Sequence, residues 1–284
     1  MKNARPQLVR SDSLHQQVAR TIRNEIEAGI LRDGDVLPST RELAAHWGVS
    51  VFTVAEAMKL LVQENLIITK ARSKRIVHAP TAAPRPRMRS QAPRVLLIGG
   101  YAGSGKTHLG RILARETGWP LLDKDTLTRP VVEAALEALG SSPHDRESDT
   151  YLQVVRPREY EALMAAVDEN VTCGASVIVT APFLREFADR AWLDRLHADQ
   201  AASDVSTTLI WVHCDAETMQ TYIRHRGAAR DAGKLTGWTH YVNGVDLEFR
   251  PAAPHIVIDN RPSAAPLQKQ ARDVINGLFA GRAT

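Results

Sequence analysis

The chain of 284 residues has a formal net charge of +4, an apolar fraction of 44% and two cysteines. Its length indicates two domains or one large one, and its apolar fraction excludes wholesale disorder. No stretch approaches the roughly 18 apolar residues of a membrane span, and the N-terminal residues lack the apolar core of a signal peptide. Because the chain has only Cys173 and Cys214, without metal-ligand spacing, we expect a cytoplasmic protein that has no disulfide framework and no structural zinc. We also expect no membrane contact.

The positive charge is concentrated in the first third of the chain. Residues 1–94 hold 16 lysines and arginines against 8 acidic residues, a net charge of +8, whereas residues 95–284 have a net charge of −4. The basic part suits a polyanionic partner. Residues 79–94 contain four prolines and four arginines. Because proline fixes φ and removes a hydrogen-bond donor, this composition predicts an extended linker over residues 79–93. A basic arm along phosphates is an alternative role.

Residues 8–78 have the pattern of a small domain made of helices and a two-stranded ribbon. Apolar residues recur at every fourth position from Leu14 to Ile26, and serines suited to N-caps precede the later helices. The predicted elements are helices over residues 13–28, from Ser39 to Gly48 and over residues 51–64, and strands over residues 66–69 and 75–78. The third helix is expected to turn Val54, Met58, Leu61 and Val62 inward.

This order of elements is that of a winged helix-turn-helix, in which the third helix enters the major groove of DNA. A small helical domain used for protein contact is the alternative. The stretch DGDVLPSTRELAAHWGVSVFTVAEAMKLLVQENLI resembles the GntR family of bacterial transcription regulators. The resemblance covers the whole domain and implies dimeric binding to pseudo-palindromic sites on double-stranded DNA, with an effector domain on the C-terminal side.

The resemblance and the basic wing together give the expected DNA contacts. The residues expected to contact DNA are Arg41, Ser50, Thr53, Lys70, Arg72, Lys74 and Arg75. Val51 and Ala55 stand where family members commonly carry arginines, and the wing tip lacks its usual glycine. Since a bidentate arginine–guanine contact contributes roughly 1–3 kcal/mol of discrimination, we expect weaker or altered specificity, with the wing carrying more of the binding.

A phosphate-binding loop opens the second part of the chain. The apolar run over residues 94–99 leads into GYAGSGKT and then into a helix-forming segment, which is GxxxxGKT in its strand–loop–helix context. Lys106 is expected to reach the β- and γ-phosphates and to act in catalysis, and the Thr107 hydroxyl to coordinate Mg²⁺. The expected cofactors are ATP or GTP with Mg²⁺. The predicted nucleotide contacts are Gly100, Gly103, Ser104, Gly105, Lys106, Thr107 and His108.

Strands and helices alternate over the rest of the chain. Strands are predicted over residues 94–99, 121–123, 176–181, 208–212 and 255–259, and helices over about 127–139, 157–173, 185–198, 216–227 and 265–279. The expected fold class is therefore α/β: a winged helix-turn-helix domain followed by a P-loop NTPase domain over residues 94–284. Five alternating strands imply a parallel sheet with helices on both faces and ligand at the carboxyl ends of its strands.

Two groups of charged residues are candidates for phosphoryl transfer. A carboxylate after the second strand can accept the proton of a substrate hydroxyl or hold magnesium. Asp125 is the first choice for these roles and Asp123 the second, unless one of them only caps the following helix. Arg226 and Arg230, beside glycines, suit a catalytic lid that closes on the transferring phosphate. The alternative is a solvated basic helix end.

The segments GGYAGSGKT, LLDKDTL, VIVTAPF, YIRHRGAARDAGKL and HIVIDN resemble the small P-loop kinases, among them zeta toxin, gluconate kinase and chloramphenicol phosphotransferase. The resemblance places both arginines in the lid, and Asn260 and Arg261 near the adenine. Thr180 stands where many P-loop proteins carry an acid. Magnesium binding is then expected to depend on Thr107 and Asp125, and catalysis to be slow or absent.

Two functions are left open by the sequence. The first is a transcription regulator whose P-loop domain binds a nucleoside triphosphate and senses or phosphorylates a small molecule. The second is an ATP-dependent small-molecule kinase in which the winged helix serves dimerisation or autoregulation. The expected partners are double-stranded DNA, the nucleotide, an unidentified small-molecule effector or substrate, and a second copy of the chain in a homodimer.

Overall fold

A computed structural model describes residues 13–70, 74–78, 92–203 and 205–280, with side chains for the same residues except 199–203, 230 and 280. Most of the predicted linker lies outside these residues, as do Arg72 and the side chain of Arg230. The chain divides into two compact units. One comprises residues 1–82 with 262–265, and the other residues 83–261 with 266–284.

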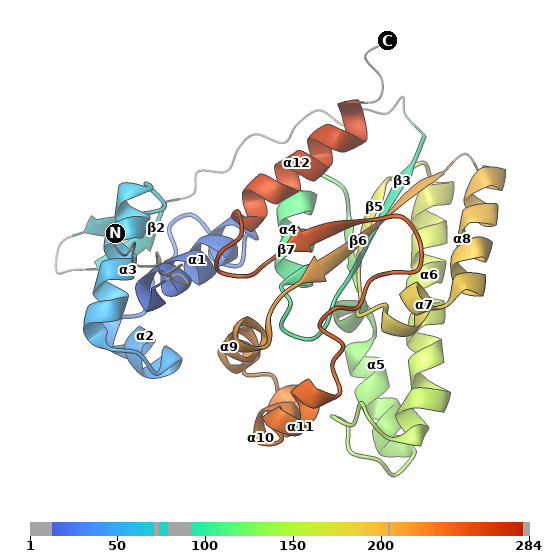
Figure 1. Ribbon diagram of the computed structural model, residues 1–284, viewed down its shortest axis with the longest axis horizontal. Helices are drawn as coiled ribbons and strands as arrows, with labels where there is room; N and C mark the ends of the chain where they lie inside the picture. The colour runs from blue at the N-terminus through green and yellow to red at the C-terminus, as the bar shows by residue number, and fades with distance from the viewer. Residues whose placement is uncertain (1–12, 71–73, 79–91, 204, 281–284) are drawn as a thin grey trace, which may run out of the picture. The chain divides into compact units, whose positions relative to one another are not determined.

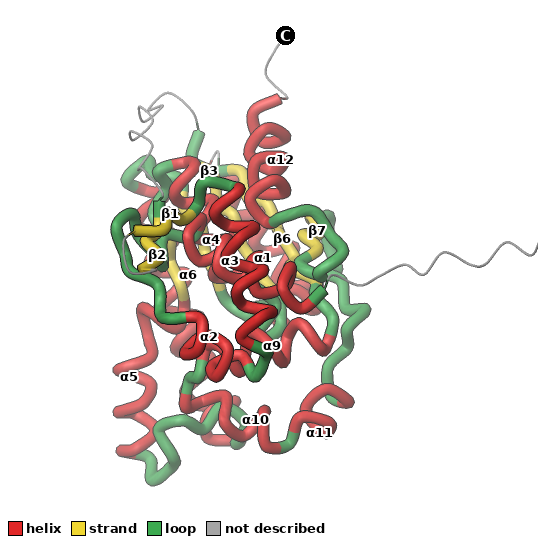
Figure 2. The backbone as a smooth tube through the Cα atoms, turned by 90° about the vertical axis from the view of Figure 1, so that its left-hand side faces the viewer, coloured by secondary structure: helices red, strands yellow, loops and turns green. Residues whose placement is uncertain are grey.

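The N-terminal unit has three helices and a two-stranded antiparallel ribbon within its described residues. These elements are α1 (Leu14–Glu27), α2 (Thr40–Trp47), α3 (Val51–Gln63), β1 (Ile67–Lys70) and β2 (Lys74–Val77). Helices α1 and α3 pack side by side (Figure 2). The ribbon pairs Ile67 with Val77. This is the predicted order of a winged helix-turn-helix.

Polar caps set the starts of α2 and α3. Ser39 Oγ accepts a hydrogen bond from Glu42 N at 3.3 Å, while a Glu42 carboxylate oxygen accepts one from Ser39 N at 2.7 Å. The hydrogen bonds from Ser39 lower the pKa of the Glu42 carboxyl from its ordinary value. Ser50 Oγ accepts a hydrogen bond from Thr53 N and so caps α3. Helix α2 ends at Gly48, whose φ of 64° favours glycine.

Two apolar side chains of this unit are more exposed than their spacing suggests. The core comes from the stripe of α3 that contains Val54, Ala57, Met58 and Leu61, together with residues of α1, α2 and the ribbon. The expected inward position of Val62 is wrong, because this residue lies beyond the edge of that stripe and is 38% exposed. Leu14, in the first turn of α1, is 55% exposed.

The second unit is built on a five-stranded parallel sheet with strand order β4-β5-β3-β6-β7 (Figure 1). The strands are β3 (Arg94–Gly99), β4 (Leu121–Asp123), β5 (Val177–Thr180), β6 (Ser206–His213) and β7 (His255–Asp259). Every pair of neighbours is parallel. The sheet confirms the predicted α/β class. Strands β3 and β5 are buried along nearly their whole length, as expected for a sheet covered on both faces.

Helices cover both faces of this sheet (Figure 1). Helices α4 (Lys106–Thr117) and α12 (Leu267–Ala280) pack together on one face. The other face carries α6 (Arg156–Thr172), α7 (Leu184–Ala188) and α8 (Arg190–Ser203), whose side chains share a core with Leu97, Val179 and Trp211 of the sheet. The remaining α-helices are α5 (Lys124–Ala138), α9 (Ala216–Arg226), α10 (Ala232–Thr236) and α11 (Trp238–Asn243). Among the described residues, no helix has the length and apolarity needed to cross a membrane.

Three local features differ from the sequence prediction. The single helix expected over residues 185–198 is two helices, because Asp189 adopts an extended conformation and its carboxylate accepts hydrogen bonds from Ala191 N and Trp192 N. A π-helix, η2 (Thr150–Val155), precedes α6. The predicted lid contains a 3₁₀ turn, η3 (Ala229–Asp231), followed by α10 and α11.

Candidate functional site

The loop between β3 and α4 has the backbone geometry of a phosphate cradle. Gly103 and Gly105 have φ values of 78° and 97°, in the region that favours glycine. A Cβ atom at Gly103 would lie 2.5 Å from Met219 O, and one at Gly105 would lie 2.3 Å from Asn260 Nδ2. Both positions therefore require glycine for conformational and steric reasons, and α4 begins immediately after the loop, at Lys106.

Asn260 holds this loop from the end of β7. Its Nδ2 donates to Ser104 O at 2.9 Å, its backbone N donates to His213 O at 2.9 Å, and the residue is almost fully buried. The resemblance to kinases placed Asn260 by the adenine and missed this contact with the P-loop. The available signal was an amide side chain directly after an apolar strand.

The polar groups of the loop fit a bound phosphate group. Lys106 Nζ donates to Tyr101 O at 3.2 Å, which keeps the ammonium group at the loop. Ser104 Oγ is buried and has no hydrogen-bond partner among the described residues. The N-terminus of α4 adds partial positive charge and backbone N–H groups. A glycine cradle, an ammonium group and a helix N-terminus are the donor set that phosphate oxygens require.

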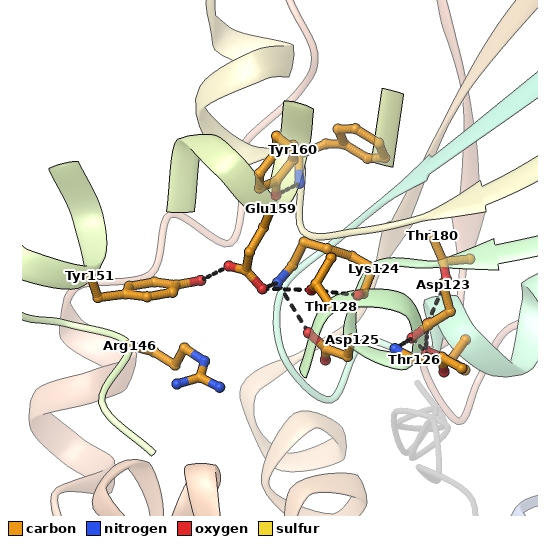
Figure 3. A network of polar contacts seen from close by, with 12 residues as sticks. Asp123, Lys124, Asp125, Thr126, Thr128, Arg146, Tyr151, Glu159, Tyr160 and Thr180 are labelled. Atoms are coloured by element: carbon orange, nitrogen blue, oxygen red, sulfur yellow. Dashed lines mark hydrogen bonds and ion pairs between the residues drawn. The ribbon is translucent and has the colours of Figure 1, made fainter. Parts of the chain in front are cut away.

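Asp123 connects the P-loop helix to two neighbouring strands (Figure 3). Its Oδ2 accepts hydrogen bonds from Thr180 Oγ1 at 2.6 Å and Thr107 Oγ1 at 3.3 Å. Its Oδ1 accepts from Thr126 N at 3.0 Å, which caps α5. Asp123 therefore caps the helix and also contacts the hydroxyl expected to coordinate magnesium.

The sheet register places a carboxylate opposite Thr180, the position at which many P-loop proteins carry an acid. Asp123 on β4 is paired with Thr180 on β5, so the carboxylate is supplied by the adjacent strand and Thr180 donates to it. Mg²⁺ takes oxygen ligands and is usually held by one or two carboxylates together with substrate phosphates. Thr107 and Asp123 fit this donor set, because Asp123 accepts a hydrogen bond from Thr107. Asp125, the first choice from the sequence, pairs with Lys124.

A buried ion pair lies beside Asp125 (Figure 3). Lys124 and Glu159 are 4% and 3% exposed, and Lys124 Nζ lies 2.6 Å from Glu159 Oε1 and 3.1 Å from Asp125 Oδ1. Thr128 Oγ1 donates to Glu159 Oε1 at 2.9 Å, and Tyr151 Oη donates to Glu159 Oε2 at 2.7 Å. One carboxylate on α6 thus binds α5 and η2. No local pattern in the sequence indicates this pair, because 35 residues separate its members.

Tyr151 acts as a hydrogen-bond donor in this network. Burial raises the pKa of its hydroxyl above the ordinary range, and the charge of Glu159 raises it further. The hydroxyl therefore keeps its proton for Glu159. The Arg146 guanidinium lies over the Tyr151 ring, 5.3 Å from its centroid. The π-helix that carries Tyr151 is a rare element that is frequent at functional sites.

The predicted lid arginine Arg226 is paired within its own segment. Its guanidinium forms an ion pair with Asp231, and its Nε donates to Asp231 Oδ2 at 2.9 Å. Asp231 is buried and also lies 3.5 Å from Lys234 Nζ. Burial and, secondly, the charge of Asp231 raise the pKa of Tyr241 to about 12. Arg226 is thus held by a carboxylate in the structure.

Among the described residues expected to contact DNA, Arg41 lies on α2, Ser50 and Thr53 at the start of α3, and Lys70, Lys74 and Arg75 on the ribbon. Arg41, Lys70 and Lys74 are exposed, and the last two face each other across the ribbon. The Ser50 and Thr53 hydroxyls lie 2.8 Å apart at the start of α3. Arg75 is half-buried and pairs with Thr69 across the ribbon.

The two units define the class of the protein: a winged helix-turn-helix joined to a P-loop domain. The family model described as AAA domain matches residues 95–237, half of the chain, and the chain belongs to this family. Residues 14–75 match the model described as bacterial regulatory proteins, gntR family. The chain therefore carries a GntR-type domain fused to a P-loop kinase-like domain, which confirms both resemblances.

Known proteins match each part separately. A shikimate kinase of Moorella thermoacetica is 33% identical over 106 residues, which cover 36% of this chain and 58% of that protein. The HTH-type transcriptional regulator TauR of Rhodobacter capsulatus is 39% identical over 82 residues, covering 29% of this chain and 16% of that protein. A solved putative kinase from Chloroflexus aurantiacus is 20% identical with a TM-score of 0.47, covering 68% of this chain and 99% of that one. The chain thus spans little more than half of the shikimate kinase and a small part of TauR.

Proposed function

We propose that this protein is a DNA-binding transcription regulator whose P-loop domain binds ATP or GTP with Mg²⁺ and senses or phosphorylates a small molecule. The proposal depends on one observation: a single chain contains both a GntR-type domain and a P-loop domain, and the residues of the P-loop fit a phosphate group. The protein would act as a homodimer on double-stranded DNA. We propose that the protein acts in the cytoplasm, because the DNA that it would bind is in that compartment.

In the nucleotide site, the proposed roles follow from the donor groups. The P-loop backbone, Lys106 and the α4 N-terminus bind the phosphates, and Thr107 with Asp123 holds the metal ion. When bound, Mg²⁺ neutralises charge on the β- and γ-phosphate oxygens. Of the lid arginines, Arg226 must leave Asp231 before it can contact a phosphate.

The proposal is tested by measuring the affinity of the full-length protein for duplexes selected from a random pool, with and without ATP and Mg²⁺. We expect binding that weakens steeply with salt, and a change of affinity of roughly 5–150-fold when the nucleotide is added. Unchanged DNA affinity at saturating nucleotide would contradict nucleotide control. Retention of duplex that does not depend on salt would contradict electrostatic docking.

A small-molecule kinase is the second candidate function, and Asp125 favours it. This carboxylate is 40% exposed at the carboxyl end of the sheet, beside the buried Lys124–Glu159 pair. There Asp125 would accept the proton of a hydroxyl group on the acceptor molecule. The oxygen of that hydroxyl would bond to the γ-phosphorus, and the bond between the γ-phosphorus and the nucleoside diphosphate would break. The similarity to a shikimate kinase supports an acceptor with a hydroxyl group. Metabolite-dependent ATP turnover without any nucleotide effect on DNA binding would favour this candidate.

Replacing Asp123 with asparagine is expected to raise the Mg²⁺ concentration needed for ATP binding by about 10–100-fold, the range typical for residues around a metal site. Asparagine is also a good N-cap, so α5 keeps its cap. ATP binding is measured by calorimetry over a Mg²⁺ titration, and binding in EDTA should change little. Asp125→Asn is the matched variant. If Asp125→Asn raises the Mg²⁺ requirement and Asp123→Asn does not, the assignment to Asp123 is wrong.

A further inference from the structure

The first turn of α3 presents two apolar side chains to solvent. Phe52 is 73% exposed and Val51 is 48% exposed, although large apolar side chains gain free energy on leaving water. The core of the unit is formed by the stripe of α3 that contains Val54, Met58 and Leu61. Because a helix turns by about 100° per residue, Phe52 points nearly opposite to this stripe.

The polar side chains Ser50, Thr53 and Glu56 have partners within α3 and its N-cap. Ser50 Oγ accepts a hydrogen bond from Thr53 N at 3.0 Å, and the two hydroxyls lie 2.8 Å apart, so both belong to the N-cap. Glu56, one turn after Phe52, forms an ion pair with Lys59 at 2.6 Å. The apolar groups are therefore the distinctive feature that the start of α3 offers to a partner.

Exposed cations lie on the elements around these apolar side chains. Arg41 on α2 and Lys70 and Lys74 on the ribbon are exposed. Such charges suit a polyanion. In a winged helix-turn-helix the N-terminal residues of the recognition helix contact base edges in the major groove, where the apolar group is the C5-methyl of thymine.

We propose that Phe52 and Val51 read thymine methyl groups in the major groove. This inference rests on the proposed DNA-binding function and gives it a substrate preference, namely duplexes with thymine at the positions that face α3. Phosphate contacts from the exposed cations supply affinity for any sequence, and the apolar contacts supply discrimination.

The test begins with duplexes that the full-length protein selects from a random pool. Each conserved thymine is replaced by deoxyuridine, which removes only the methyl group. We expect binding to weaken roughly fourfold for each methyl that is read, the fold-change that corresponds to burial of one such group. In Phe52→Ala the difference between thymine and deoxyuridine should largely disappear, while the dependence of affinity on salt stays the same, because no phosphate contact is lost.

Leu14→Ala is the matched control, since Leu14 is also an exposed apolar side chain of this unit. It should retain the full difference between thymine and deoxyuridine. The proposal is overturned if deoxyuridine leaves wild-type affinity unchanged, or if Phe52→Ala keeps the whole penalty. It is also overturned if Phe52→Ala changes only the molecular mass in light scattering, which would make this turn a contact between copies of the chain. If wild-type protein binds no duplex at all, the proposed DNA-binding function itself fails, and this result is distinct from a missing methyl effect.

Discussion

Replacing Lys106 with alanine is expected to weaken ATP binding by about one to two orders of magnitude. Lys106 Nζ lies at the P-loop, 3.2 Å from Tyr101 O, and supplies the mobile positive charge of the phosphate cradle. A hydrogen bond to a charged group contributes about 1.5–3 kcal/mol, and loss of the ammonium group also leaves phosphate charge uncompensated. Isothermal titration calorimetry of the full-length protein with ATP and Mg²⁺ measures this loss.

The control for this experiment is Lys269→Ala, which removes an exposed lysine from α12. Its affinity for ATP should equal that of the wild type. An affinity of Lys106→Ala within threefold of the wild-type value would show that the loop does not bind phosphate. The result would leave the DNA-binding part of the proposal untouched.

Replacing Glu159 with alanine is expected to lower the free energy of unfolding of the second unit by up to about 3–5 kcal/mol, the usual cost of removing one member of a buried ion pair. Lys124 would lose its 2.6 Å contact with Glu159 and keep the 3.1 Å contact with Asp125. Tyr151 would lose its acceptor, and Thr128 would keep only the carbonyl oxygen of Lys124. Urea denaturation followed by tryptophan fluorescence measures the change. Four of the five tryptophans lie after residue 94, so the signal reports mainly on this unit.

Glu161→Ala is the matched control, on the same helix and two residues away. Glu161 pairs with Arg158 at 2.5 Å, but both side chains are exposed. An exposed pair contributes at most about 1 kcal/mol, so the midpoint of unfolding should hardly move. Equal effects of the two substitutions would contradict the role assigned to the Lys124–Glu159 pair.

The parts of the fold that were predictable are those set by local pattern. Ser39 and Ser50 cap helices because their hydroxyls bond to backbone N–H groups three residues away, and β3 and β7 have the predicted bounds because their apolar runs are uninterrupted. The break at residue 189 was not predicted, since one helix was expected over residues 185–198. The break depends on the hydrogen bonds that the Asp189 carboxylate accepts from Ala191 N and Trp192 N. Local hydrogen bonds thus decide boundaries that hydrophobic spacing does not show.

The candidate site was predictable only in part, since its contacts join residues far apart in the chain. The loop sequence identified Lys106 and Thr107, but the contact of Thr180 with Asp123 depends on the pairing of β4 with β5, 57 residues apart. The sequence shows that Asp123 and Asp125 follow one strand, but it does not show which of the two carboxylates turns toward Thr107. Strand register and side-chain direction decide this, and both are products of the folded sheet.

The contact between Asn260 and Ser104 has a consequence for the order in which the two parts of the protein are completed during translation. The P-loop acquires its last hydrogen-bond partner only when the chain has been synthesised beyond residue 260, which is 156 residues after Ser104. The buried core of the GntR-type domain, in contrast, comes from residues 18–77. On the ribosome, all residues of that core are therefore available long before the nucleotide site can be completed. During translation, a nascent DNA-binding domain would precede the part of the chain proposed to control it.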